Sequence, residues 1–203
     1  MNDRKKALVI RLAAFGDAII VTPLFRILHE DGYDVTFHTS KGGLEVTRHN
    51  PYIKQYSLHD HNIPPNDKLT QYFAEISKGY DKVINLCESI EGSLAKVPWR
   101  DDFKWTKEKL HEECNKNFYD NTMELAGYPE KKGLNGELFF SSIEETLARD
   151  IRNKYRGKFL VLWSLSGSSV HKAYPFAEHV AKILLDKYDD IQILTVGDSL
   201  CGL

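Results

Sequence analysis

An apolar run at residues 7–12, followed closely by a second apolar stretch at 17–28, constrains the fold more than any other feature. The first run is short and nearly continuous, as in a strand of a parallel sheet that is covered on both faces. The second is apolar nearly all round, which is typical of a buried helix. Alternating Val35, Phe37 and Thr39 indicate a second strand. Strand, helix and strand in this order predict a βαβ unit.

Thr22 and Pro23 interrupt the expected helix. Either the proline kinks it, or Thr22 caps a new helix with proline at its first position. The alternation of strands and helices then continues along the chain. We expect strands at residues 53–58, 81–86 and 137–140, helices at 42–48, 68–78, 107–126 and 142–155, and a loop region with a short helix at 88–106.

The pattern starts again at Gly157, with a strand at 159–163, a loop at 164–174, a helix at 176–187 and a strand at 191–196. The sequence therefore predicts an α/β chain with one domain at residues 1–156 and the beginning of a second at 157–203. A second domain of ordinary size would need on the order of 100 further residues. We expect a chain that stops partway through this domain.

Composition and charge narrow the function classes. The formal net charge is −2 and the pI is near 6.4, which gives no reason to expect a nucleic acid partner. The three cysteines are widely spaced and odd in number, which argues against a disulfide framework or a zinc site. His59, Asp60 and His61 could suggest a metal, but they lie in a proline-containing loop where such residues are usually exposed to solvent. We expect no metal and no cofactor.

The chain shows no membrane-spanning segment. The nearest candidate, residues 7–28, carries Arg11, Asp17 and Arg26, each of which is costly in the bilayer centre. No short apolar stretch is followed by a small-residue cleavage site, as in a signal peptide. We expect a cytoplasmic protein with at most peripheral contact with the inner face of the membrane.

The loop after the first strand is the first candidate site, because ligands in open parallel sheets bind at the carboxyl ends of strands. The dinucleotide fingerprint is absent, since only Gly16 follows Ala13 and Ala14, and a nicotinamide-dependent enzyme is disfavoured. Gly16 is expected to let the chain turn and approach a ligand closely. Asp17 lies at the start of a helix, where the positive end of the helix dipole stabilises a carboxylate. The alternative is that Asp17 only caps the helix.

The serine-rich segment 164–175 is the second candidate site. Small hydroxyl residues that open onto a helix can turn backbone N–H groups and hydroxyls toward a phosphate, and Lys172 supplies a compact cation. The spacing is not that of a Walker loop. A flexible serine-rich connection is the alternative interpretation.

Three motifs, taken in order, resemble a known family. Residues 9–17, with Pro23 after them, resemble the opening of the glycosyltransferase family 9 proteins, the ADP-heptose:lipopolysaccharide heptosyltransferases. Residues 80–86 are similar to the later YD-x-V-I-D-L strand of that family, with Asn85 in place of Asp. Residues 166–175 resemble the family's loop at the start of its second domain, with Tyr174 in place of Trp.

The resemblance implies a GT-B fold, in which two Rossmann-like domains place the active site between them. It implies inverting, metal-independent transfer from a nucleotide-sugar donor, here ADP-heptose, to a lipopolysaccharide-core or other glycan acceptor. Asp17 would act as the general base, and Ser168 and Lys172 would hold the donor diphosphate. The family's Asp-x-Gly-x-x-His-type donor motif lies beyond the point where this chain ends.

Three residues are expected on the acceptor side: Gly16, Arg11 and Arg100. Arg11 either faces an acceptor phosphate or pairs with a neighbouring carboxylate. Arg100 follows Trp99 in an irregular region where a glycolipid acceptor could contact the first domain, although for Trp99 itself packing on the surface is the favoured interpretation. The alternative function is a non-catalytic remnant or binding module that retains the acceptor-side domain.

Overall fold

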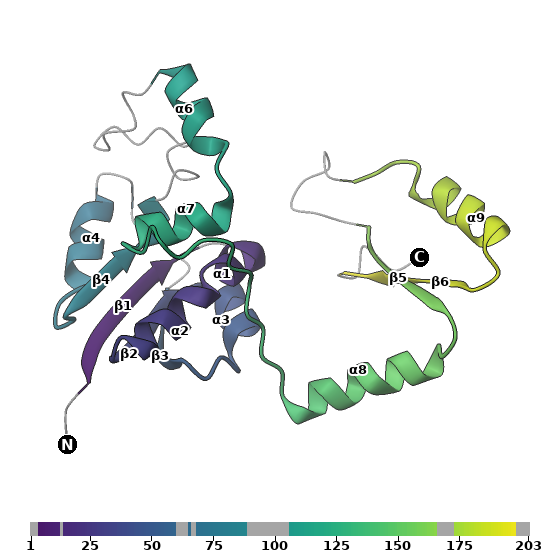
Figure 1. Ribbon diagram of the computed structural model, residues 1–203, viewed down its shortest axis with the longest axis horizontal. Coiled ribbons are helices and arrows are strands. Elements are labelled where there is room, and N and C mark those ends of the chain that lie inside the picture. Colours follow the sequence, from purple (N-terminus) through teal and green to yellow (C-terminus); the bar gives the residue numbers. More distant parts are fainter. Residues whose placement is uncertain are drawn as a thin grey trace. The chain divides into compact units, whose positions relative to one another are not determined.

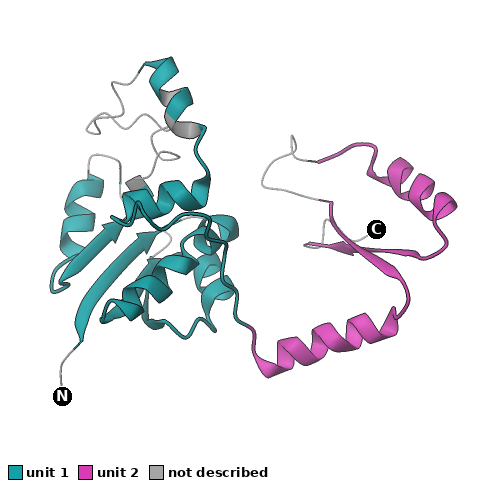
Figure 2. Cartoon of the chain, viewed as in Figure 1, with its two compact units in different colours: residues 1–139 teal, residues 140–203 magenta. Residues whose placement is uncertain are grey.

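The computed structural model describes residues 4–12, 14–59, 65, 68–88, 106–165 and 173–197, without the side chains of residues 88, 110, 113 and 114. The chain divides into two compact units, residues 1–139 (unit 1) and residues 140–203 (unit 2) (Figure 2). The predicted boundary between functional domains at residues 156 and 157 stays a prediction.

Unit 1 is built on a four-stranded, fully parallel sheet with the order β3-β2-β1-β4 (Figure 1). The strands are β1 (Lys5–Arg11), β2 (Tyr33–Thr39), β3 (Ile53–Leu58) and β4 (Lys82–Asn85). Because β1 has a neighbour on each side, its apolar run is enclosed, and Ala7 to Ile10 are at most 1% exposed. The predicted βαβ unit is confirmed.

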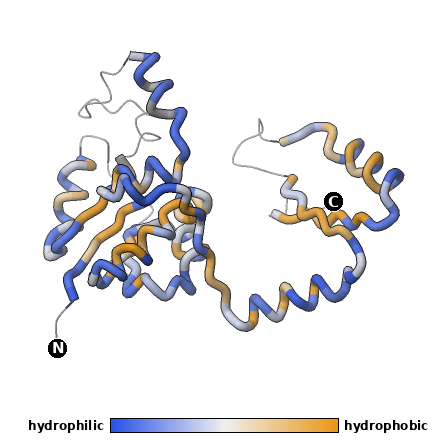
Figure 3. Tube along the Cα trace, in the orientation of Figure 1, coloured by the Kyte–Doolittle hydropathy of each residue, from blue (hydrophilic) through white to orange (hydrophobic). Residues whose placement is uncertain are grey.

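Helices cover both faces of this sheet. The described part of unit 1 contains the helices α1 (Phe15–Ile20), α2 (Thr22–Glu30), α3 (Lys41–Thr47), α4 (Leu69–Ile76), the short 3-10 helix η2 (Leu86–Glu88), α6 (Lys107–Cys114) and α7 (Phe118–Leu125). On one face Val9 and Phe37 pack with Phe25 of α2 and Met123 of α7. On the other face Leu8 and Ile10 pack with Phe73 of α4. Apolar stretches of the trace lie along β1 and within α2 (Figure 3).

Unit 2 contains α8 (Ser142–Lys154), β5 (Phe159–Ser164), α9 (Ala177–Lys187) and β6 (Ile191–Val196). The strands β5 and β6 pair in parallel. This is the predicted β-loop-α-β arrangement, and the two parallel sheets confirm the α/β fold class. Helix α8 begins with a capping box, in which Ser141 and Glu144 each accept the other's backbone N–H.

Two predicted elements are wrong. The single helix expected at residues 107–126 is two helices, because the Asn117 side chain accepts the N–H groups of Tyr119 and Asp120 and starts α7 anew. The strand expected at 137–140 forms no ladder. The N–H of Glu137 instead donates to the Thr22 hydroxyl at 2.7 Å, so this extended segment is fixed to α2.

The apolar stretch at 17–28 is also divided. Helix α1 ends at Ile20 and α2 begins at Thr22, with Val21 as its N-cap and Pro23 in its first turn. A new helix with an early proline is therefore the correct alternative, but its N-cap lies one residue before Thr22. The Thr22 hydroxyl donates to the carbonyl of Ile19 at 2.7 Å, which satisfies one of the last carbonyls of α1.

Candidate functional site

Asp17 lies at the third position of α1, and its carboxylate reaches back to the start of the helix. Oδ2 accepts the backbone N–H of Ala14, the N-cap residue, at 3.2 Å. Ala14 has no side-chain acceptor, so this half of a capping box is formed without the other half. Asp17 thus has a capping role, made from inside the helix rather than at the N-cap. That role occupies only one of its two oxygens.

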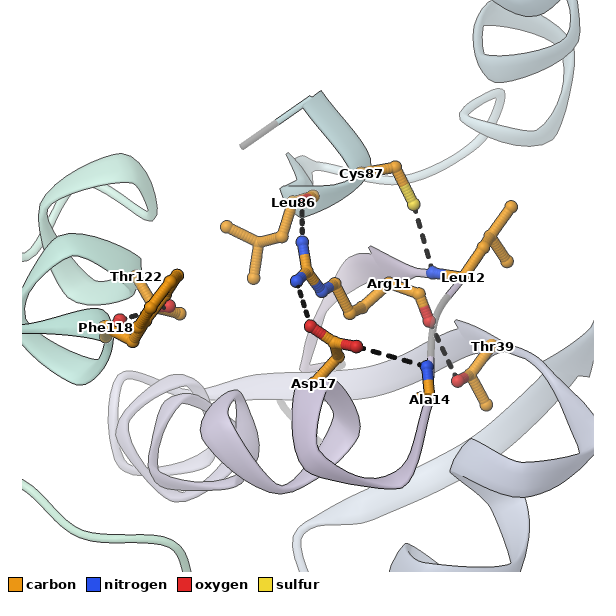
Figure 4. A network of polar contacts seen from close by, with 9 residues as sticks. All are labelled: Arg11, Leu12, Ala14, Asp17, Thr39, Leu86, Cys87, Phe118 and Thr122. Atoms are coloured by element: carbon orange, nitrogen blue, oxygen red, sulfur yellow. Dashed lines mark hydrogen bonds and ion pairs between the residues drawn. The ribbon is translucent and has the colours of Figure 1, made fainter. Parts of the chain in front are cut away.

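The other oxygen of Asp17 is paired with Arg11, the last residue of β1. Arg11 Nη2 pairs with Asp17 Oδ1, and Arg11 Nη1 donates to the carbonyl of Leu86 at 2.6 Å (Figure 4). The two side chains are only 11% and 19% exposed, so solvent screens this pair weakly. One guanidinium therefore ties together the ends of β1 and β4 and the first turn of α1. Of the two alternatives for Arg11, the geometry shows the carboxylate pair.

The backbone beside Arg11 is fixed from both sides. The Thr39 hydroxyl, at the end of β2, donates to the Arg11 carbonyl at 2.9 Å. The N–H of Leu12 donates to Cys87 Sγ at 3.1 Å, and the N–H of Cys87 donates to Asn85 Oδ1 at 3.0 Å. The carboxyl ends of β1, β2 and β4 thus converge on the segment that precedes Asp17 (Figure 4). A carboxylate on such a support is held in one orientation before any ligand arrives.

A small cavity adjoins the Arg11–Asp17 pair. Its volume is about 10 Å³, which is room for roughly one water molecule. The lining residues come from β1, α1, η2 and α7 and the turn after α1: Arg11, Asp17, Ile20, Val21, Leu86, Phe118, Asn121 and Thr122. A sugar does not fit in this volume.

Gly16 lies within α1 and not in a tight turn. Its φ is not in the left-handed region, and an added Cβ would meet no described atom within 4 Å. The expected turn at Gly16 is therefore not what the structure shows. The residue leaves open space directly beside Asp17.

Three of the predicted site residues lie outside the described residues: Arg100, Ser168 and Lys172. The segment that holds Ser168 and Lys172 connects the end of β5 at Ser164 to the start of α9 at Ala177, as the sequence predicts. Asp60 and His61 also lie outside, while His59 is described. Among the described residues, no group of three potential metal ligands comes together, and no helix is long and apolar enough to cross a membrane.

Sequence reasoning missed the two residues of η2 that hold Arg11 and Leu12, shortly before Asp17 in the chain. Leu86 contributes a backbone carbonyl and Cys87 an acceptor sulfur, and neither contact depends on a residue pattern that a single sequence displays. It also missed His38, a buried histidine near the carboxyl end of β2. Its signal is a titratable side chain between Phe37 and Thr39 of the predicted second strand.

No protein-family model matches the sequence, and no curated protein matches it either. Solved structures do match. One is a glycosyltransferase family 9 protein from Veillonella parvula, with a TM-score of 0.64 and 15% identity. The match covers 98% of this chain and 64% of that protein's chain. The ADP-heptose lipopolysaccharide heptosyltransferase II of E. coli matches with a TM-score of 0.59, 17% identity and coverages of 96% and 65%. The E. coli heptosyltransferase WaaC with ADP matches with a TM-score of 0.54, 12% identity and coverages of 97% and 69%.

These likenesses extend over nearly the whole of this chain, which spans about two thirds of the length of the matched chains. At 12–17% identity they establish the fold. The chain thus has the GT-B type fold of the glycosyltransferase family 9 and heptosyltransferase structures, over the part of those structures that it covers.

Proposed function

We propose that this protein is a glycosyltransferase that moves a heptose-like sugar from an ADP-sugar to a lipopolysaccharide-core or other glycan acceptor. The observation that carries the proposal is the Asp17 carboxylate, held at the carboxyl edge of the sheet by Arg11 and the N–H of Ala14. The likeness to E. coli heptosyltransferase structures, one of them with ADP, supports the choice of donor. That similarity concerns the fold, so the choice of sugar rests on the motifs as well.

The proposed reaction is a single displacement. The acceptor hydroxyl oxygen bonds to the anomeric carbon while the bond from that carbon to the diphosphate oxygen breaks. The nucleotide diphosphate leaves with the electron pair, and the Asp17 carboxylate takes the hydroxyl proton. Attack from the face opposite the leaving group inverts the anomeric configuration.

Arg11 is proposed to act through Asp17. Its guanidinium is occupied by the Asp17 carboxylate and the Leu86 carbonyl, so its contribution on the acceptor side is to orient the base. A carboxylate can accept several hydrogen bonds at once, and we propose that a substrate hydroxyl donates one of them to Asp17. We propose that Gly16 leaves room for the acceptor beside that carboxylate, and that Arg100 contacts the acceptor.

On the donor side we propose Ser168 and Lys172 as ligands of the diphosphate. The leaving group gains negative charge as the glycosidic bond breaks, and an ammonium with hydroxyl and backbone donors can stabilise this charge without a metal. The protein would work in the cytoplasm, at the inner face of the membrane if its acceptor is a glycolipid.

The first test is donor binding followed by transfer. Titration calorimetry of the 203-residue chain with ADP and ADP-heptose should give saturable binding that Lys172→Ala weakens, with Lys187→Ala on α9 as the matched control. Incubation with ADP-heptose and a lipopolysaccharide-core acceptor should then give a product whose mass increases by one heptose. Donor binding without transfer would favour a non-catalytic binding module. The absence of both donor binding and transfer would overturn the proposal.

Gly16→Ala tests the acceptor side separately. An added methyl group meets no described atom, so the variant should fold as stably as the wild type. If the acceptor occupies the space beside Asp17, the substitution should raise the KM for the acceptor and leave the Kd for ADP unchanged. An unchanged KM would exclude Gly16 from the acceptor site.

A further inference from the structure

A second polar cluster in unit 1 is independent of Asp17 and lies on the sheet face that α4 covers. His38 of β2 is 3% exposed, and both of its ring nitrogens have partners. Nδ1 lies 2.8 Å from the Ser57 hydroxyl of β3, and Nε2 lies 2.7 Å from the Tyr72 hydroxyl of α4. The same Tyr72 hydroxyl lies 3.0 Å from Nδ1 of His59, directly after β3. Ser57, His38, Tyr72 and His59 therefore form one hydrogen-bonded chain, the His38 chain.

The end of this chain leaves one atom unsatisfied. His59 Nε2 is buried and has no hydrogen-bond partner among the described residues. A buried N–H without an acceptor is rarer in proteins than a buried acceptor without a donor. The neutral chain should therefore leave Nε2 of His59 unprotonated, with the proton of this ring on Nδ1.

That choice fixes the direction of every bond. His59 Nδ1–H donates to the Tyr72 oxygen, the Tyr72 hydroxyl donates to Nε2 of His38, and Nδ1–H of His38 donates to Ser57. Both histidines are then Nδ1–H tautomers. Each of the three bonds uses one hydrogen, so the neutral chain is complete.

One additional proton leaves all three bonds intact. If His59 takes it on Nε2, no other hydrogen has to move. If His38 carries the charge instead, it donates to both Ser57 and Tyr72, and the Tyr72 hydroxyl turns to donate to Nδ1 of His59. In either form His59 bears an N–H on Nε2.

A second additional proton does not fit. Both imidazolium rings then direct an N–H at the Tyr72 oxygen, and the Tyr72 hydroxyl loses both of its acceptors. The two rings, whose centroids are 6.0 Å apart, also carry like charges. The chain as built can therefore hold one extra proton but not two.

The surroundings of His38 favour its neutral form. Burial, and then the proximity of His59, lowers the pKa of His38 to about 4. Besides His59, the titratable groups that face the chain among the described residues are Tyr72 from α4 and Cys87 from η2. Burial, with a smaller effect from Cys87, raises the pKa of Tyr72, so its hydroxyl stays protonated at neutral pH. Within these elements no carboxylate contributes to the His38 shift.

We propose that the His38 chain is a pH-operated latch that fastens α4 to the carboxyl ends of β2 and β3. It is closed while it carries at most one extra proton, and the second protonation opens it. Acidification should therefore release α4 from the sheet before the rest of unit 1 unfolds. This inference does not depend on the proposed transferase activity.

The test combines two measurements on the 203-residue chain. Histidine tautomers are read from two-bond ¹H–¹⁵N correlations, and both His38 and His59 should be Nδ1–H forms at pH 7.5. Amide hydrogen exchange is then followed from pH 7 to 4 and corrected for the intrinsic effect of pH. Protection of the α4 amides should fall by about tenfold or more, while α2 amides lose much less.

Two variants and a control isolate the latch. His59→Gln removes one of the two charges and should shift the loss of α4 protection to lower pH. Tyr72→Phe removes the central hydroxyl and should lower α4 protection already at pH 7. His179→Gln replaces an exposed histidine on α9 in unit 2. It should change neither the α4 protection at pH 7 nor the pH at which that protection is lost. The proposal is overturned if α4 and α2 lose protection together, or if His59→Gln leaves the pH of the α4 transition unchanged. Nε2–H tautomers at both histidines would also overturn it, whether or not the variants fold.

Discussion

The strands β1 and β5 have similar apolar sequences, yet they are buried to very different extents. In β1, Val9 and Ile10 are fully buried, between β2 and β4 and beneath helices on both faces. In β5, Phe159 is 66% exposed and Leu162 is 67% exposed, and this strand pairs with β6 alone among the described residues. A continuous apolar run indicates a strand suited to a sheet covered on both faces, but burial requires the neighbouring strands and helices as well.

The same contrast holds for the helices. Helix α2 has six buried residues, Phe25 and Leu28 among them. Neither α8 nor α9 has a buried residue, and Ile143 of α8 is 80% exposed. We therefore expect unit 1 to contribute most of the cooperative stability of this chain, with unit 2 adding little.

The largest effect is expected in the core of unit 1. Phe25 is fully buried, and its ring centroid lies 4.8 Å from that of Phe37. Phe25→Ala should lower the free energy of unfolding by about 3–5 kcal/mol because it leaves a cavity. Leu162→Ala in β5 should change it by less than about 0.5 kcal/mol. Urea unfolding followed by circular dichroism measures both values, and equal costs would contradict the contrast between the units.

A smaller effect is expected on acidification. The pKa of His38 is about 4 in the folded state against 6.5 in a model peptide. The unfolded chain therefore binds a proton more readily, and the free energy of unfolding should fall as the pH drops from 6.5 through about 4. The upper limit of this loss is about 3 kcal/mol.

Urea unfolding of the 203-residue chain at pH 7, 5.5 and 4 measures this loss of stability. His38→Gln should lose less stability than the wild type over this range, because other titrating groups are common to both chains. His179→Gln, which alters an exposed residue of unit 2, should behave as the wild type does. Identical pH dependence in the wild type and His38→Gln would show that His38 is not held in its neutral form.

The next prediction compares the cost in stability of alanine at two glycines near the candidate site. An alanine Cβ at Gly43 would lie 2.0 Å from the Thr39 hydroxyl, which also holds the Arg11 carbonyl. Gly43→Ala should cost about 1–3 kcal/mol because the helix α3 packs tightly there. Gly16→Ala, within α1 and with no described atom nearby, should be neutral or stabilise the fold by up to about 1 kcal/mol. Thermal unfolding of the two variants measures both changes in stability. A Gly16→Ala variant less stable than Gly43→Ala would contradict the packing described.

The smallest effect is expected at the start of α8. Ser141→Ala removes the side chain that accepts the N–H of Glu144 and should destabilise this helix by about 1 kcal/mol. Ser142→Ala is the matched control, because Ser142 is the first helical residue and does not fill the cap position. Hydrogen exchange of the α8 amides compares the two. Equal exchange rates in both variants would mean that the capping box does not hold this helix.

Much of the fold could be predicted because it depends on local pattern. The apolar run of β1, the alternation of β2 and the capping box of α8 all lie within a few consecutive residues. The break in the predicted helix at 107–126 was missed because Asn117 is a weak signal within an otherwise amphipathic stretch. The prediction of a strand at 137–140 was wrong because an extended, apolar segment can also run along a helix. Here the N–H of Glu137 donates to the Thr22 hydroxyl of α2 and not to another strand.

The candidate site could be predicted only in part. The sequence singles out Asp17 as a candidate because it closely follows the first strand and lies in the first turn of the first helix, and its role as a base stays a prediction. Its pairing with Arg11 was one of two alternatives, and the geometry decided between them. The carbonyl that accepts from Arg11 belongs to Leu86 of η2, 75 residues further along the chain, and local patterns do not span that separation. The His38 chain likewise depends on the register of β2 against β3 and on the position of α4.

The central claim is that Asp17 removes the acceptor proton during sugar transfer. Asp17→Asn tests it most directly, because asparagine retains an oxygen for the N–H of Ala14 but cannot take up the proton. With saturating ADP-heptose and acceptor, the transfer rate should fall by about 10²–10⁴ while the Kd for ADP stays the same. A variant that transfers heptose at the wild-type rate would contradict the account.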